Sequence, residues 1–197
     1  MQKFIKVIVC LSFGIPLVVV SSSFIFPFVV PKILLFRSLV LLMLAGYILL
    51  LCADWQKYRP RFTLINIAVA CFFLSFVVST FVGVDWYKSF WDNHERMLGL
   101  FTILHFAVFY FVLTSTFKKW DDWRLFLRVF LFAGSIVMFI GILQKIYPEL
   151  LLNRGSGRVS ATLGNAIYFS GYGLFLFFIG LLLFFKEKTR FWKCWAV

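Results

Sequence analysis

Long apolar runs separated by short charged clusters dominate the pattern of hydrophobic and polar positions along this chain. Each of the longest runs can form a helix that crosses a hydrocarbon core of about 30 Å, which needs roughly 20 apolar residues. Their continuous apolar character does not fit the alternating pattern of membrane barrel strands. These charge-free runs lie between Lys6 and Lys32, Arg61 and Asp85, Arg96 and Lys118, and Arg158 and Lys186.

Two shorter runs, 38–53 and 129–144, become membrane helices if Arg37 and Arg128 lie just inside a helix end and extend outward to the interface. The N-terminal run follows two lysines, as in a signal peptide, but it lacks a small-x-small cleavage site, so we expect it to be retained. The sequence therefore predicts an all-α fold, a polytopic bundle of transmembrane helices in a single domain covering 1–197. The expected spans are approximately 5–27, 33–53, 63–83, 98–117, 125–146 and 163–185.

Composition supports a membrane protein, because 62% of the 197 residues are hydrophobic and 14% are charged, far from soluble usage. The net charge of +12 would suggest nucleic acid for a soluble protein, but anionic lipid headgroups and topology explain it here. We therefore expect membrane lipids and no nucleic acid as partners. The four cysteines fall in helices or on one side, so neither a disulfide, a metal site nor a cofactor is predicted.

Lysine and arginine counts predict the orientation of the helices. With a cytoplasmic N-terminus, thirteen of these cations lie in inner segments and seven in outer segments. The sequence thus favours both termini in the cytoplasm. Two longer, more polar connections, 83–99 and 147–165, then lie on the outer face and hold most of the candidate chemistry.

The first outer connection ends in DNHERMLG at residues 92–99. Asp92 or Asn93 is expected to cap the next helix, with Glu95 in its first turn, although His94 or Glu95 could also act as a general base. Arg96 lies at the apolar boundary, where it either binds an anionic group or contacts lipid. His105 is expected to be a buried neutral histidine bonded to a neighbouring helix.

The second outer connection contains RGSGRVSATLGN at residues 154–165. Its glycines allow a turn and a close backbone approach, Ser160, Thr162 or Asn165 can cap the following helix, and helix N-termini attract anions. Arginine forks suit phosphate oxygens. We therefore predict a diphosphate site, with lipid headgroup contacts as the alternative. Its candidate residues are Arg158, Arg96, Arg154, Lys32 and Arg37.

Three segments resemble the N-terminal half of the O-antigen ligase/polymerase superfamily, a group of bacterial polytopic membrane proteins. They are FPFVVPKILLFR, SFWDNHERMLGLFTILH and RVSATLGNAIYFSGYG, entering the second, fourth and sixth expected spans. The resemblance implies transfer of a glycan from an undecaprenyl diphosphate carrier to an acceptor at the outer face of the bacterial cytoplasmic membrane. It also implies inverting, metal-independent chemistry in which arginines such as Arg96 and Arg158 hold the diphosphate.

The family's long outer loop, with its essential histidine, follows the sixth helix and has no counterpart in these residues. We therefore expect the N-terminal part of a longer protein, and no catalytic base or acceptor is assigned. A transporter or flippase for a lipid-linked or anionic substrate is an alternative function, although it would place more polar residues near mid-membrane. A non-enzymatic membrane subunit is a further alternative.

The predicted orientation can be tested by cysteine accessibility in intact cells, with single reporters replacing Ser89, Ser156 and Lys119. Reporters at 89 and 156 should react with an impermeant thiol reagent from outside, because they lie in outer connections. The reporter at 119 should react only after lysis. Labelling at 119 alone from outside would show the opposite orientation.

Overall fold

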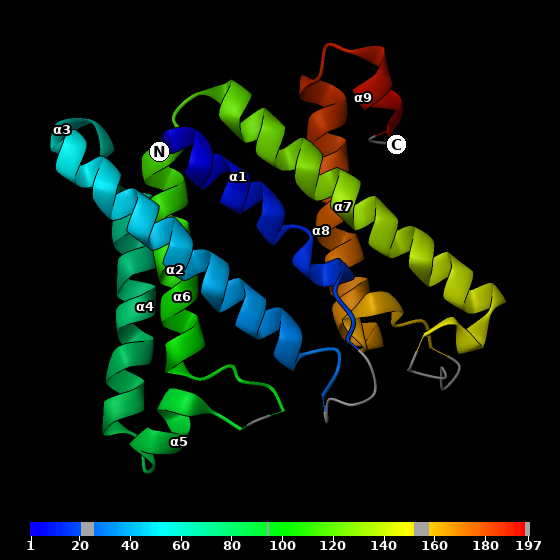
Figure 1. The fold of residues 1–197 in the computed structure, drawn as a ribbon, viewed down its shortest axis with the longest axis horizontal. Helices are drawn as coiled ribbons and strands as arrows, with labels where there is room; N and C mark the ends of the chain where they lie inside the picture. The colour runs from blue at the N-terminus through cyan, green and yellow to red at the C-terminus, as the bar shows by residue number, and fades with distance from the viewer. Residues whose placement is uncertain (21–25, 94, 152–157, 196–197) are drawn as a thin grey trace. The chain divides into compact units, whose positions relative to one another are not determined.

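The structure is a computed structural model that describes residues 1–20, 26–93, 95–151 and 158–195, and no strand occurs among them (Figure 1). Four helices in this part of the chain are long and apolar enough to cross a membrane. The shorter apolar helix α6 (Leu100–Thr116) has 17 residues. The expected all-α fold is therefore confirmed for the described residues, and the length and composition of these four helices support a membrane protein. The four long helices are α2 (Val30–Ala53), α4 (Leu64–Val82), α7 (Trp120–Ile146) and α8 (Ala166–Lys186).

The expected first helix, 5–27, is wrong as a single element. Helix α1 (Gln2–Ser12) ends early, and a 3-10 turn, η1 (Ile15–Leu17), follows. Pro16 explains the end, because proline lacks an N–H and its ring clashes with the carbonyl four residues earlier, which belongs to Ser12. Eleven residues make a helix of about 16 Å, shorter than a hydrocarbon core.

The other five expected helices are present, with ends shifted by up to five residues. Short elements that the apolar pattern did not predict lie between them. In one of these, the Asp85 carboxylate accepts a hydrogen bond from the Lys88 N–H at 2.9 Å and caps the helix. These short elements are α3 (Trp55–Tyr58), α5 (Trp86–Trp91), η2 (Pro148–Leu150), η3 (Ala161–Leu163) and α9 (Arg190–Trp195).

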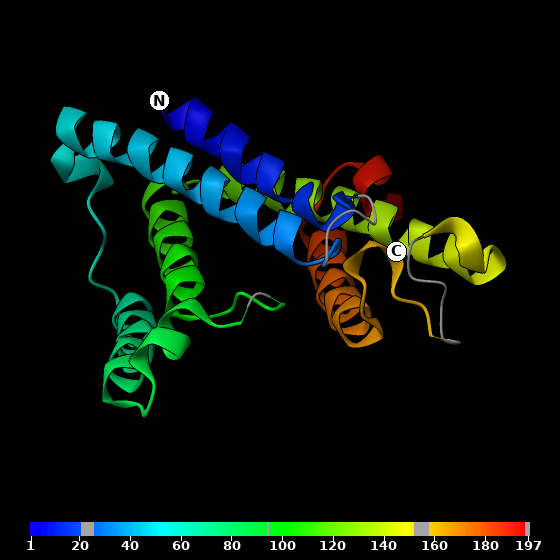
Figure 2. The same cartoon turned by 60° about the horizontal axis from the view of Figure 1, so that its bottom comes forward.

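The chain divides into two compact units, and the first comprises Met1–Val9 and Ile33–Lys118. In this unit α4 and α6 lie side by side and the short α5 joins them at one end (Figures 1 and 2). Two hydroxyl hydrogen bonds hold its elements together: Tyr47 donates to the Tyr58 carbonyl at 2.8 Å, and Tyr110 donates to the Asn66 side-chain oxygen at 2.9 Å.

The second unit comprises Cys10–Lys32 and Lys119–Val197. Here α7 packs on α8 through small residues. A Cβ added at Gly134 would lie 2.2 Å from the nearest Leu176 methyl carbon, and one at Gly141 would lie 2.5 Å from the Phe169 ring. Close approach through small residues is a common way for membrane helices to gain van der Waals contact, since lipid provides no hydrophobic drive between them.

An ion pair joins α7 to the C-terminal end of α8. The Arg128 guanidinium donates to both oxygens of Glu187, at 2.8 and 2.7 Å, and lies 4.9 Å from the centroid of the Trp192 ring. Hydrogen bonding from Arg128 lowers the pKa of the Glu187 carboxyl. The Arg128 side chain therefore extends to the end of α8, where its charge is paired with a buried carboxylate.

Gly141→Val should lower the stability of the second unit, because the added carbons overlap the Phe169 ring. Overpacking of this kind costs about 1–3 kcal/mol. Thermal unfolding in detergent measures the change. Gly171→Val is the matched control, since a Cβ at Gly171 of α8 meets nothing within 4 Å. Equal shifts in Tm for the two variants would contradict this account of the α7–α8 contact.

Candidate anion-binding site

The segment that leads into α8 is the best-built polar feature of the second unit. Asn165, one of three candidate caps in the sequence, caps α8, and its side-chain oxygen accepts from the Ile167 N–H at 2.8 Å. Gly164 before it has φ 75°, and a Cβ there would lie 2.6 Å from Phe28. Only glycine combines this left-handed backbone with so close an approach. The N-terminus of α8 is therefore fixed against the 26–32 segment.

Gln144, near the end of α7, anchors the turn before α8. Its side-chain oxygen accepts from the Ser160 N–H at 3.1 Å and from the Ala161 N–H at 2.7 Å. Gln144 and Ala161 are buried, and Ala161 has φ 46°, which is uncommon for a residue with a side chain. The two hydrogen bonds stabilise this backbone conformation and satisfy two amide donors of a buried turn.

Lys32, predicted as a site residue, lies at the same turn. Its ammonium donates to the Phe28 carbonyl and to the Thr162 carbonyl, each at 2.7 Å. Its nitrogen is 5.7 Å from the centroid of the Phe28 ring. An ammonium has three donors, so one N–H is available after these two bonds. None of the ion pairs among the described residues involves Lys32, and its charge is therefore not neutralised there.

Two further groups of this turn lack partners in the described part of the chain. Thr162 is 3% exposed, and its hydroxyl makes no hydrogen bond. Arg158, four residues earlier, is exposed, and none of the hydrogen bonds or ion pairs between described residues uses its guanidinium. Four residues span at most about 14 Å, so Arg158 is close enough in the chain to share this turn. Arg154 lies outside the described residues.

The turn can therefore present several donors to one anion: an arginine fork, the third N–H of Lys32 and the Thr162 hydroxyl. The amides at the start of α8, a helix of 21 residues, add the positive end of its dipole. The sequence pointed to Lys32 and Arg158 as site residues, and to Thr162 only as a possible helix cap. It missed Gln144, whose signal was an amide side chain inside an otherwise apolar run, since such a group must find an internal partner in a membrane.

Arg37 and Arg96 belong to the first unit and differ from each other. Arg37 is 8% exposed, so its side chain is buried within the protein. Its guanidinium donates to the Thr102 hydroxyl and, at 3.1 Å, to the Met97 carbonyl, and it lies 4.8 Å from the centroid of the Phe101 ring. These contacts give Arg37 a structural role that links α2 to the start of α6.

Arg96 is exposed, and its guanidinium has no hydrogen bond or ion pair with the described residues. The neighbouring acids do not cap α6 as expected, because α6 begins after Gly99 without a side-chain cap. Instead Asp92 has φ 61° and its carboxylate accepts from the Leu98 N–H at 2.9 Å, while Asn93 accepts from the Arg96 N–H. His94 lies outside the described residues.

His105 is buried, as the sequence predicted, but its partner is different. Its Nδ1 lies 2.7 Å from the carbonyl of Phe101 in the same helix, whereas a bond to a neighbouring helix was expected. Nε2 has no partner among the described residues. The histidine ring packs edge-on against Phe101, with centroids 4.7 Å apart. His105 therefore belongs to the packing around Arg37 in the first unit.

Comparison with known proteins adds no family to these observations. No family model, curated protein or solved structure matches this chain.

Arg37→Met should destabilise the first unit, because it removes charged hydrogen bonds to Thr102 and Met97 and the contact with Phe101. Hydrogen bonds to charged groups contribute about 1.5–3 kcal/mol. Arg96→Met is the control, since exposed substitutions usually change stability by less than about 0.5 kcal/mol. Thermal unfolding in detergent compares the two variants. An Arg37 variant as stable as the control would show that the buried arginine does not hold α2 to α6.

Proposed function

We propose that this chain binds an undecaprenyl diphosphate-linked glycan and serves the transfer of that glycan to an acceptor in bacterial cell-surface polysaccharide synthesis. The turn before α8 would hold the diphosphate. One observation supports this most directly. The exposed Arg158 precedes a turn that contacts the un-neutralised ammonium of Lys32, and within this turn the Thr162 hydroxyl has no partner among the described residues. Groups of this kind complement a doubly charged, oxygen-rich ligand.

The proposal places this turn at the outer face of the cytoplasmic membrane. It rests on six crossings with both termini in the cytoplasm, an arrangement that the distribution of cations favours. With this orientation, the N-terminal ends of α2 and α8 face outward. The polyprenyl chain of the donor would then lie in the lipid beside these helices, with its diphosphate at the depth of Lys32 and Arg158.

Binding of the leaving group is the part of the chemistry that these residues support. When the glycan leaves its carrier, negative charge develops on the diphosphate, and fixed cations lower the energy of that charge. Arginine suits this task, because its guanidinium stays protonated and offers a planar fork to two oxygens. The resemblance to O-antigen ligases and polymerases supports the same assignment for Arg158. Binding of an anionic group by Arg96 stays a prediction from the sequence.

Arg158→Ala should weaken binding of undecaprenyl diphosphate by about tenfold to a hundredfold, because it removes charge-assisted hydrogen bonds of about 1.5–3 kcal/mol. Arg158→Lys should restore part of the affinity, since an ammonium keeps the charge and loses the fork. Affinities are measured for the protein in nanodiscs. Undecaprenyl monophosphate, measured in parallel, should bind more weakly to the parent protein. Its affinity should also fall by a smaller factor in Arg158→Ala.

Arg190→Ala is the control for general charge, because Arg190 begins α9 at the other end of α8. This variant should bind the diphosphate as tightly as the parent. If Arg158→Ala also binds as tightly as the parent, Arg158 contacts only lipid headgroups and the diphosphate site is not there.

A further inference from the structure

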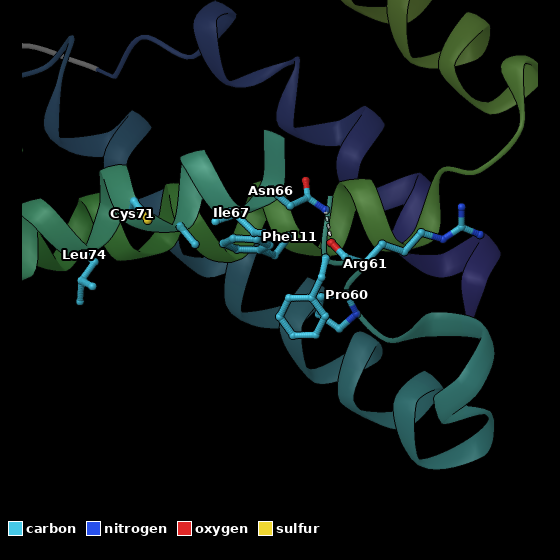
Figure 3. Close-up of a pocket in the computed structure, with 9 residues that line it drawn as sticks. Pro60, Arg61, Asn66, Ile67, Cys71, Leu74 and Phe111 are labelled. Carbon is cyan, nitrogen blue, oxygen red and sulfur yellow. Dashed lines mark hydrogen bonds between the residues drawn. The ribbon is translucent and has the colours of Figure 1, made fainter. Parts of the chain in front are cut away.

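The first unit contains a groove that the proposed function does not use. It has a volume of about 440 Å³ and runs along α4 beside Phe111 of α6, with Arg61 at one end and Leu74 at the other (Figure 3). Ile67, Ala70 and Leu74 line it from one face of α4, at the spacing that helical periodicity requires. The small side chain of Ala70 leaves the hollow between its larger neighbours.

The polar side chain at the groove's end is satisfied inside the protein. Asn66 donates to the Arg61 carbonyl at 2.8 Å and accepts from the Tyr110 hydroxyl at 2.9 Å. The groove therefore offers an apolar surface to whatever fills it. From Asn66 to Leu74 the helix rises about 12 Å, which is within the depth of one leaflet of a hydrocarbon core about 30 Å thick.

A cluster of cations adjoins the Arg61 end of the groove, and we call it the basic cluster: Lys57, Arg61 and Lys118, all exposed. The Lys118 ammonium donates to the Lys57 carbonyl, and both lysines lie over the Tyr58 ring, at 5.6 and 5.2 Å from its centroid. Desolvation lowers the pKa of Lys118, and the charges of Arg61 and Lys57 lower it further.

One carboxylate accompanies these three cations. Asp54 partly offsets the lowering of the Lys118 pKa, but one of its oxygens already accepts from the Lys57 N–H at 3.0 Å as the cap of α3. The basic cluster therefore retains excess positive charge directly beside an apolar groove. A ligand that complements both must join an anionic head to a hydrocarbon chain.

We propose that this groove is a specific site for an anionic phospholipid, with one acyl chain between α4 and Phe111 and the phosphate at Arg61 and Lys118. Phosphatidylglycerol has this chemistry. The lipid would cover part of α4. Only 6% of the most apolar 18-residue stretch of this helix is buried within the protein. This site is separate from the turn before α8 and does not depend on the proposed function.

Native mass spectrometry of the 197-residue protein in detergent tests this site with phosphatidylglycerol and phosphatidylcholine as probes. The parent should bind phosphatidylglycerol at least about fivefold more tightly, because each basic residue near a lipid phosphate contributes about that factor. Substituting both Arg61→Gln and Lys118→Gln should remove the preference. Arg190→Gln, which lies in the second unit, should keep it.

Ala70→Phe tests the groove itself. It should weaken phosphatidylglycerol binding by at least about fivefold, because the ring occupies the space of several acyl carbons. Val78→Phe is the matched control on the same helix, where the parent side chain is exposed and outside the groove. Thermal unfolding in detergent checks that both variants fold. If Ala70→Phe does not fold, the Arg61 and Lys118 variants still test the site.

Three results would overturn the proposal. One is equal affinity of the parent for the two lipids. Another is equal binding by the Ala70 and Val78 variants. The third is a dimer of the parent that Ala70→Phe dissociates without any change in lipid binding, which would show that a second copy of the chain fills the groove.

Discussion

Lipid offers no hydrogen bonds, and this constraint decides where the polar side chains of this chain lie. A polar group inside the apolar region must find a partner within the protein or reach the interface. Gln144 finds two backbone amides, and Glu187 finds both arms of the Arg128 guanidinium. Each of these contacts joins segments that are distant in sequence. These few polar side chains therefore connect the elements of the second unit, while its many apolar side chains supply the packing surface.

The same constraint separates the cations by role. Arg37 uses its donors on Thr102 and Met97 and stacks near Phe101, so its charge is committed to the fold. Arg158 has none of these commitments among the described residues and is exposed. Residue type follows the role, because a planar fork suits an aromatic face or phosphate oxygens, and a compact ammonium suits two converging carbonyls. Lys32, which bridges Phe28 and Thr162, is of the second kind.

Apolar run length predicted the positions of five helices well, since a charge-free run long enough to cross a membrane leaves the backbone few alternatives. It failed at Pro16, where a local steric rule ends the helix inside an apolar run. It did not predict the partners of Arg37, because a sequence does not tell which neighbouring helix offers an acceptor. The Asn165 cap was predictable from local pattern, whereas the positive φ of Asp92 depends on how its loop folds back.

The electrostatics of the turn before α8 depend on how Lys32 is held. Backbone carbonyls are dipoles, so they stabilise the ammonium without cancelling its charge, whereas a carboxylate would cancel it. Glu187 shows that alternative, because its carboxylate is paired with the Arg128 guanidinium and also lies near Arg124. Water screens a half-buried charge less than an exposed one. Lys32 therefore adds a poorly screened positive charge beside a turn that Gln144 binds through two backbone amides.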